Sequence, residues 1–143
     1  MPTIFLTGFP GFLGSALVER LLDRTPQETT ISCLIQPRWR GLAEQKAFSL
    51  ERQKTMRIGR IRLVEGDITH PGLGLGEAYT SLQEETVEIY HLAAVYDLSV
   101  KREFAFRVNV EGTRNVLDFA EGCKNLSRFQ YVSTCYVSGR YEG

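Results

Sequence analysis

The sequence has no excess of charge of either sign. Its 143 residues include 17 lysines and arginines and 17 aspartates and glutamates, so the formal net charge at pH 7 is zero. A protein that holds a nucleic acid or another polyanion by bulk electrostatics carries a basic surplus. We therefore expect no nucleic-acid partner, although this balance leaves room for a local basic site.

Cysteines are few, and their spacing forms no recognisable pattern. The three cysteines are Cys33, Cys123 and Cys135, which are odd in number, far apart and without a C-x-x-C pair. This arrangement argues against a disulfide framework and against a metal site. Reduced thiols in a cytoplasmic protein are the better interpretation.

Long apolar runs are also missing. No stretch approaches the roughly 20 apolar residues that a membrane-spanning helix needs. The N-terminus lacks the basic segment and apolar core of a signal peptide. We expect a soluble, cytoplasmic protein without a membrane span.

Three glycines separate a short apolar run from a helical pattern near the N-terminus. Residues 2–7 are typical of a buried strand and residues 11–24 of a helix, with Gly8, Gly11 and Gly14 at the junction. Such a turn lets a diphosphate approach the main chain and face the positive end of the helix. The alternative is a plain strand-to-helix turn that is rich in glycine. The candidate cofactor-binding residues here are Thr7, Gly8, Phe9, Pro10, Gly11, Phe12, Leu13 and Gly14.

Strand and helix patterns alternate along the whole chain. Further strands are predicted at residues 30–35, 60–65, 87–94 and 128–133, and further helices at residues 41–57, 77–85 and 104–123. This alternation predicts an α/β fold with a doubly wound parallel sheet of the Rossmann type, truncated after the fifth strand. The length fits one domain.

The end of the second strand carries two arginines and no acid. The sequence there runs from Gln36 through Arg38 to Arg40, and the first carboxylate is Glu44. In dinucleotide-binding folds an acid at this point binds the adenosine ribose of NAD, whereas an arginine accommodates the 2′-phosphate of NADP. The pattern therefore favours NADP over NAD. The alternative is a solvated basic loop on the surface.

Two further positions leave alternatives open. The Asp67 carboxylate could accept a hydrogen bond from adenine, or it could form an Asx turn before Pro71, and the residues favour neither. We expect His91 to serve packing or local hydrogen bonding rather than catalysis.

The helix predicted at residues 104–123 shows the strongest apolar pattern. We expect one side of it to be formed by Phe106, Val110, Leu117 and Ala120, with Val116, Phe119 and Cys123 adjoining. Gly112 interrupts this helix at a cost of about 1 kcal/mol relative to alanine. Asn109 places a polar side chain inside the apolar flank.

Five motifs in order resemble the extended short-chain dehydrogenase/reductase superfamily. They are Thr7-Gly8-x-x-Gly11-x-x-Gly14, Gly66-Asp67-Ile68, His91-Leu92-Ala93-Ala94, Asn109-Val110-x-Gly112-Thr113 and Val132-Ser133-Thr134. Within it the chain is most similar to the fatty acyl reductase and thioester reductase (male sterility) group. The details that carry this are Cys33-Leu34-Ile35, His91-Leu92-Ala93-Ala94 and Val132-Ser133-Thr134-x-Tyr136-Val137.

The resemblance implies roles for individual residues. The three glycines would hold the cofactor diphosphate, Asp67 and Ile68 would flank the adenine, and Leu92, Ala93 and Ala94 would lie along the cofactor. The implied catalytic residues are Asn109, which would maintain the active site from its helix, and Thr134. The Thr134 hydroxyl would bind the substrate carbonyl oxygen, where negative charge builds as hydride arrives.

The chain departs from the family pattern in two ways. The group tends to carry an arginine where this chain has Gln36, so Arg38 or Arg40 would have to bind the 2′-phosphate. The family's Tyr-x-x-x-Lys motif is absent, and no lysine follows Lys124. The tyrosine is the family's general acid. We therefore expect the N-terminal, cofactor-binding part of a longer reductase, inactive in hydride transfer by itself.

The resulting expectation is an NADP-dependent reductase of an acyl thioester, aldehyde or ketone. One alternative is a sugar-nucleotide epimerase or dehydratase that uses NAD, against which the two arginines count. Another is a non-catalytic dinucleotide-sensing regulator, against which Asn109 and Thr134 count. A homodimer through the helix at residues 104–123 is a further possibility.

Overall fold

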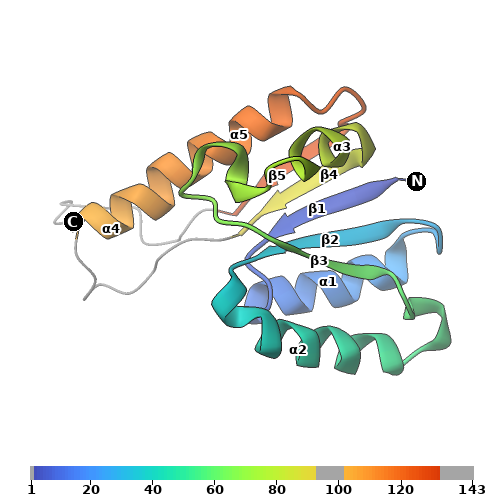
Figure 1. The fold of residues 1–143 in the computed structure, drawn as a ribbon. Helices are drawn as coiled ribbons and strands as arrows, with labels where there is room; N and C mark the ends of the chain where they lie inside the picture. Colours follow the sequence, from blue (N-terminus) through green and yellow to red (C-terminus); the bar gives the residue numbers. More distant parts are fainter. Residues whose placement is uncertain (1, 93–101, 133–143) are drawn as a thin grey trace, which may run out of the picture.

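The computed structural model describes residues 2–92 and 102–132, and this part contains a five-stranded parallel sheet between two layers of helices (Figure 1). The strand order is β3-β2-β1-β4-β5, so the chain order reverses beside β1. The strands are β1 (Thr3–Thr7), β2 (Thr30–Ile35), β3 (Ile61–Glu65), β4 (Thr86–His91) and β5 (Arg128–Tyr131). The predicted doubly wound fold is confirmed.

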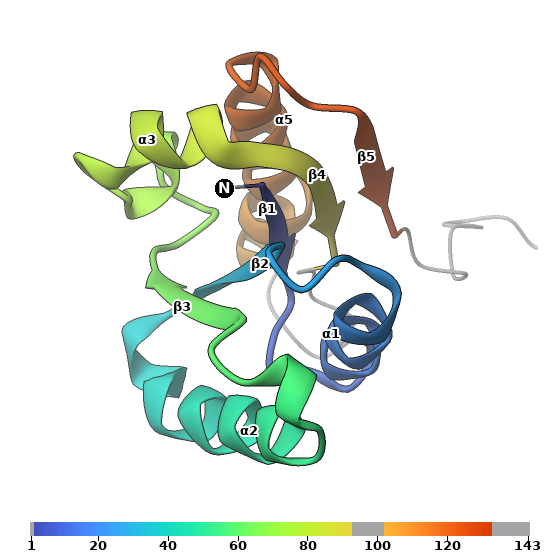
Figure 2. The same ribbon diagram turned by 90° about the vertical axis from the view of Figure 1, so that its right-hand side faces the viewer.

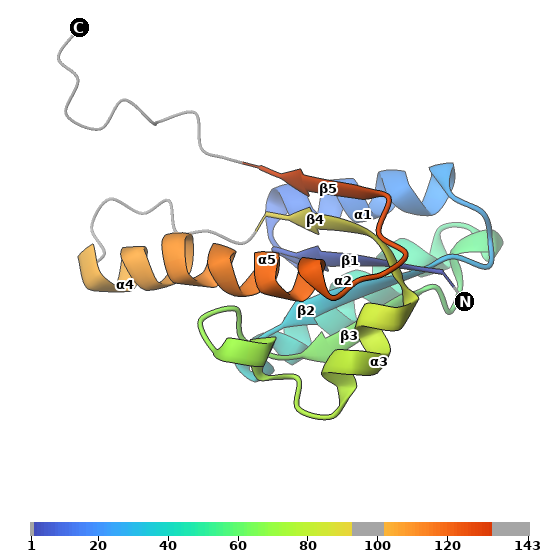
Figure 3. The same cartoon turned by 90° about the horizontal axis from the view of Figure 1, so that it is seen from above.

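The helices lie on both faces of the sheet, as the view along the strands shows (Figure 2). The α-helices are α1 (Phe12–Arg24), α2 (Arg40–Arg52), α3 (Ala78–Glu85), α4 (Arg102–Phe106) and α5 (Gly112–Glu121). A π-helical turn, Arg107–Glu111, joins α4 to α5, and the three run as one long helix beside the sheet (Figure 3). Short 3₁₀ turns occupy Pro37–Trp39, Thr55–Arg57 and Pro71–Gly74.

Alternate side chains of the central strand, β1, pack into two separate hydrophobic cores, one on each face of the sheet. Ile4 and Leu6 of β1 point into the core with α1 and α2, whereas Phe5 points into the core with α3 and α5. The ring of Phe5 lies 4.7 Å from that of Phe119, centroid to centroid. The sheet therefore needs both helical layers, because β1 is buried on its two faces.

Two details of the helices differ from the sequence prediction. The helix expected at residues 41–57 ends at Arg52, and a 3₁₀ turn follows. The long helix buries Val116 and Phe119, with the buried Cys123 just after its end, and leaves Phe106, Val110 and Leu117 between 41% and 53% exposed. Of the expected apolar side, Ala120 packs against the core, whereas Phe106, Val110 and Leu117 are about half exposed, so the prediction was wrong for these three residues. A π turn shifts the helical register, so a pattern counted across residues 107–111 does not continue.

The buried Arg60 side chain closes the C-terminal end of α1. Its guanidinium donates to the carbonyl oxygens of Leu22 (2.7 Å), Pro26 (2.9 Å) and Thr29 (3.0 Å) and to the hydroxyl of Thr25 (2.6 Å). Carbonyl groups at a helix end have no partner within the helix. Arg60 supplies these partners from the strand that begins beside it.

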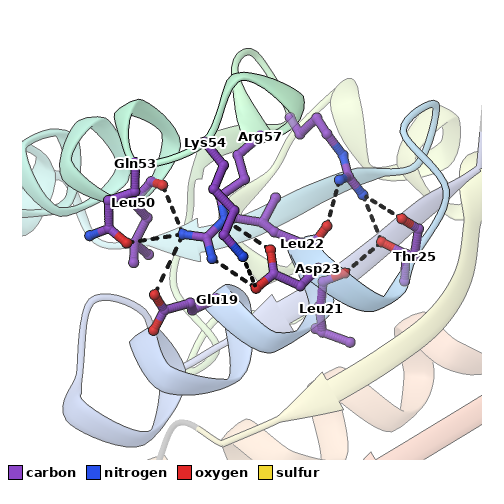
Figure 4. Close-up of polar contacts among 10 residues, drawn as sticks. Glu19, Leu21, Leu22, Asp23, Thr25, Leu50, Gln53, Lys54 and Arg57 are labelled. Carbon is purple, nitrogen blue, oxygen red and sulfur yellow. Dashed lines mark hydrogen bonds and ion pairs between the residues drawn. The ribbon is translucent and has the colours of Figure 1, made fainter.

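A second arginine joins α1 to the segment that follows α2. Arg57 is only 2% exposed and binds both carboxylate oxygens of Asp23, at 3.0 and 2.8 Å (Figure 4). It also donates to the Leu50 carbonyl at 3.1 Å. Hydrogen bonds from Arg57 and then from Lys54 lower the pKa of Asp23 from 3.8 to about 2. The cluster fixes α1 against the end of α2.

His91 ends β4 as a fully buried side chain. Its Nδ1 lies 2.7 Å from the Thr7 hydroxyl and its Nε2 lies 3.0 Å from the Thr113 hydroxyl. The ring stacks on Tyr131 with centroids 5.4 Å apart. The packing and local hydrogen bonding predicted for His91 are thus observed. Burial lowers its pKa from 6.5 to about 4.

Replacing Arg60 with methionine should lower the free energy of unfolding, because the carbonyl groups it binds would be left buried without donors. The expected loss is about 1–3 kcal/mol. The matched control is Arg20→Met, because Arg20 is exposed on α1 and makes no ion pair within the described residues. Urea denaturation of both variants measures the difference. Equal midpoints would contradict this role of Arg60.

The free energy of unfolding should decrease as the pH is lowered, because His91 takes up a proton more readily in the unfolded chain. Its pKa is about 4 in the folded chain against 6.5 when unfolded, so the unfolded chain binds the proton more readily. The contribution is complete above pH 6.5 and is lost as the pH falls to about 4, by up to about 3 kcal/mol. Denaturation series from pH 7 to pH 4 should show a smaller dependence of the free energy of unfolding on pH for His91→Gln than for the unchanged protein. If the free energy of unfolding depends on pH equally strongly in His91→Gln, this assignment is refuted.

Candidate functional site

A cleft of about 470 Å³ opens at the carboxyl ends of β1, β2 and β3. This is where open α/β sheets bind ligands, beside the strand at which the order reverses. Of the predicted cofactor-binding residues, those that line it are Thr7, Gly8, Phe9, Pro10, Gly11, Gln36, Arg38, Asp67 and Ile68. The structure thus brings together residues from three separate motifs.

Other wall residues were not foreseen from the sequence. These are Leu34, Ile35, Trp39, Leu42, Gly66, Thr69, Phe104 and Val108. Most are apolar, and a side wall of this kind suits the face of a planar ring. Leu34, Ile35 and Gly66 belong to motifs that carried the family resemblance, although no cofactor role was assigned to them. Sequence motifs do not signal Trp39, Leu42, Phe104 and Val108, because these come from a 3₁₀ turn and from helices that the fold alone places beside the cleft.

The glycine turn is held by close contacts within the backbone. Gly8 has φ = 101°, which favours glycine. A Cβ added to Gly14 would lie 2.3 Å from the Gly8 carbonyl oxygen, and one added to Gly11 would lie 2.8 Å from it. Larger residues would force the turn away from α1. The glycines therefore set the distance between the end of β1 and the start of the helix.

The first turn of α1 is left open to an anion. No side chain caps it through a hydrogen bond, and it contains no acidic residue. The hydroxyl of Ser15 donates instead to the Pro10 carbonyl at 3.0 Å. N–H groups at a helix start have no partner within the helix and attract phosphate. This donor set, next to a glycine turn, fits a dinucleotide diphosphate.

The two arginines after β2 have different surroundings. Arg40 binds the carboxylate of Glu65 through Nε and lies 3.4 Å from that of Glu44. Arg38 lines the cleft, with its guanidinium carbon 5.0 Å from the centre of the Trp39 ring. Arg38 makes no ion pair within residues 2–92 and 102–132. It is therefore the arginine with charge available to a ligand.

Asp67 forms the Asx turn that the sequence left open as one alternative. Its Oδ1 accepts hydrogen bonds from the backbone N–H of Thr69 at 2.8 Å and from the Thr69 hydroxyl at 2.7 Å. The residue still lines the cleft. Its carboxylate thus shapes the loop after β3 and stands at the cleft wall at the same time.

Gly112 allows α5 to approach this loop. A Cβ at Gly112 would lie 2.7 Å from the Cδ1 of Ile68. Asn115 also donates to the Ile68 carbonyl at 2.7 Å. The glycine that appeared as a cost within the helix therefore serves a close contact that places Ile68 at the cleft.

Of the remaining predicted residues, four are described by the structure and three are not. Phe12 and Leu13 are exposed beside the turn, and Leu92 is buried, with its N–H bound to the Thr7 hydroxyl at 3.0 Å. Asn109 lies in the π turn, and its carbonyl accepts the Thr113 hydroxyl at 2.9 Å. Ala93, Ala94 and Thr134 lie outside the described residues.

Metal-binding and membrane-spanning features were also sought. Within the described ranges, no three His, Cys, Asp or Glu side chains come close enough together to hold a metal ion. In the same part of the chain, no helix is both long and apolar enough to span a membrane.

Three similar proteins connect this site to a family. A putative fatty acyl-CoA reductase of Drosophila melanogaster is 32% identical over 98% of this chain. The reductase (R) domain of a non-ribosomal peptide synthetase from Mycobacterium tuberculosis superposes with a TM-score of 0.80 at 31% identity, over 99% of this chain and 35% of that one. The terminal R domain of the myxalamid biosynthetic pathway gives 0.76 at 35% identity, over 94% of this chain and 35% of that one.

The chain spans 27% of the length of the Drosophila protein. A family model described as male sterility protein matches residues 6–143. This match covers the glycine turn, the cleft and the long helix. The chain therefore belongs to the male sterility protein family, and its fold is an NAD(P)-binding, Rossmann-like α/β domain.

Proposed function

We propose that this chain is the dinucleotide-binding part of an NADP-dependent oxidoreductase that reduces an acyl thioester, aldehyde or ketone by hydride transfer. The observation that carries the proposal is one cleft lined both by the glycine turn, which leads into the uncapped start of α1, and by Arg38. We infer that each of these two places would bind a phosphate. A dinucleotide with a 2′-phosphate has phosphates at two such separated points.

The residues divide the work of binding. The N–H groups at the start of α1, just after the glycine turn, would hold the diphosphate, whereas the Gly11 N–H is bound to the Gly8 carbonyl at 2.9 Å and closes the turn. Asp67 and Ile68 would flank the adenine on the side of β3, with Trp39 near Arg38 at the same end. Arg38 would bind the 2′-phosphate, a task for which a guanidinium is well suited because it forms charge-assisted, paired hydrogen bonds.

The bound cofactor would supply the hydride, and this chain would supply the groups around it. We assign to Asn109 the maintenance of the active site from the π turn. We assign to the Thr134 hydroxyl a hydrogen bond to the substrate carbonyl oxygen, which stabilises the negative charge that develops there. The general acid would come from a Tyr-x-x-x-Lys pair that residues 1–143 do not contain.

The substrate class is supported by the relatives' names. The similar proteins from Drosophila melanogaster and Mus musculus are called fatty acyl-CoA reductases, and an acyl-CoA is a thioester. The similar solved structures include reductase domains of non-ribosomal peptide synthetases. These names favour an acyl thioester over a simple ketone as the substrate of this protein.

Arg38→Ala should weaken NADP⁺ binding roughly tenfold, because it removes charge-assisted hydrogen bonds to the 2′-phosphate. Binding of NAD⁺, which lacks that phosphate, should stay unchanged. The matched control is Arg40→Ala, since Arg40 is already paired with Glu65 and Glu44. Isothermal titration calorimetry of each variant with both dinucleotides provides the measurement. An equal loss for NADP⁺ and NAD⁺ in Arg38→Ala would show that Arg38 does not bind the 2′-phosphate.

Gly14→Ala should weaken the binding of NADP⁺ and of NAD⁺ alike, by roughly tenfold or more, since the added Cβ would displace the turn beside the N–H donors. The control is Gly41→Ala in α2, where a Cβ meets nothing within 4 Å. That change should stabilise the protein by up to about 1 kcal/mol and leave binding unaltered. If Gly14→Ala binds both dinucleotides normally, the glycine turn is not the diphosphate site.

A further inference from the structure

A chain of hydrogen bonds runs below the cleft from β1 to the long helix. The Leu92 N–H donates to the Thr7 hydroxyl at 3.0 Å, and that hydroxyl lies 2.7 Å from Nδ1 of His91. On the other side of the ring, Nε2 lies 3.0 Å from the Thr113 hydroxyl, which donates to the Asn109 carbonyl at 2.9 Å. The imidazole thus links the end of two strands to the π turn.

The hydrogen bonds select one form of the imidazole. A threonine hydroxyl has a single proton. The proton of Thr113 is directed to the Asn109 carbonyl, so its oxygen is left to accept a hydrogen bond from Nε2–H of His91. A neutral ring protonated at Nε2 carries a lone pair at Nδ1, which faces the Thr7 hydroxyl.

Packing holds the ring in this position. His91 has no exposed surface, and its ring lies nearly parallel to that of Tyr131, at an interplanar angle of 17°. Tyr131 comes from β5, so elements on three sides of the ring are involved. The ring cannot turn over without breaking both of its hydrogen bonds.

The helix segment tied down by this ring also forms part of the cleft. Val108, in the same π turn as Asn109, lines the cleft together with Phe104 of α4. Single π-helical turns within α-helices are rare and are frequently found at functional sites. His91 supports this π turn through Thr113, one turn beyond Asn109.

We propose that His91 is a positioning residue, whose Nε2-protonated imidazole tethers the π turn through Thr113 and so sets the position of Asn109 relative to the bound dinucleotide. The role of Asn109 in this inference rests on the proposed function. The tether itself consists of contacts within the chain, so it can be tested without a reaction.

The test uses Thr113→Val, which removes the hydroxyl while keeping the shape, and Thr113→Ser, which keeps the hydroxyl. Nitrogen-15 NMR of the whole protein should show His91 protonated at Nε2 and unprotonated at Nδ1, with the signal assigned by its loss in His91→Gln. In Thr113→Val the side-chain amide signals of Asn109 should shift and the Nε2–H should exchange faster with water. Thr113→Ser should restore both.

In the whole enzyme, Thr113→Val should lower kcat roughly tenfold, with the KM for the dinucleotide changed less than threefold. Thr113→Ser should restore the kcat of the unchanged enzyme. Loss of folded enzyme alone would also lower the apparent kcat at an unchanged KM, so kcat is calculated per dinucleotide-binding site counted by titration calorimetry. A kcat per binding site that is normal in Thr113→Val would overturn the positioning role.

The outcomes separate the tether from the proposed function. The tether would be overturned, even if NADP⁺ binds, by a His91 ring that is protonated at Nδ1. It would also be overturned if the side-chain amide signals of Asn109 are unchanged in Thr113→Val. Asn109 signals that respond to Thr113→Val in a protein that binds neither dinucleotide would support the tether and overturn the proposed function.

Discussion

The rest of the structure depends on how closely α1 follows β1. The Gly8 carbonyl oxygen lies where a Cβ at either Gly11 or Gly14 would clash, so only glycines allow the helix to start there. This close start leaves the first N–H groups of α1 without side-chain caps and directs them to the carboxyl end of the sheet. The sheet order then places the loops after β2 and β3 opposite the turn, and the cleft lies between them.

Buried polar side chains stabilise the two ends of the sheet for different purposes. At the end away from the cleft, Arg60 binds the carbonyl groups that follow α1, and Arg57 joins α1 to the end of α2. At the cleft end, His91 binds Thr7 and Thr113 across the sheet. Changes at the first end should affect stability alone, whereas changes at the second also reach residues that line the cleft, such as Thr7.

The sequence predicted the elements well because their signals are local: apolar runs, helical spacing and glycines at a strand end. The pairing of Arg40 with Glu65 could not be predicted, because these residues are 25 positions apart and meet only when β3 pairs with β2. Gly112 appeared as a defect for the same reason, since its partner Ile68 belongs to another segment. The exposed stripe of the long helix was misjudged because a π turn is not visible in a periodic pattern.

The central claim is that one cleft holds a dinucleotide between the glycine turn and Arg38. A crystal structure of the protein with NADP⁺ tests it most directly. The account predicts the diphosphate at the backbone N–H groups at the start of α1, just after the turn, and the 2′-phosphate on the guanidinium of Arg38, with Arg40 still bound to Glu65. A 2′-phosphate held by Arg40 after its bond to Glu65 has broken, or a dinucleotide bound outside this cleft, would contradict it.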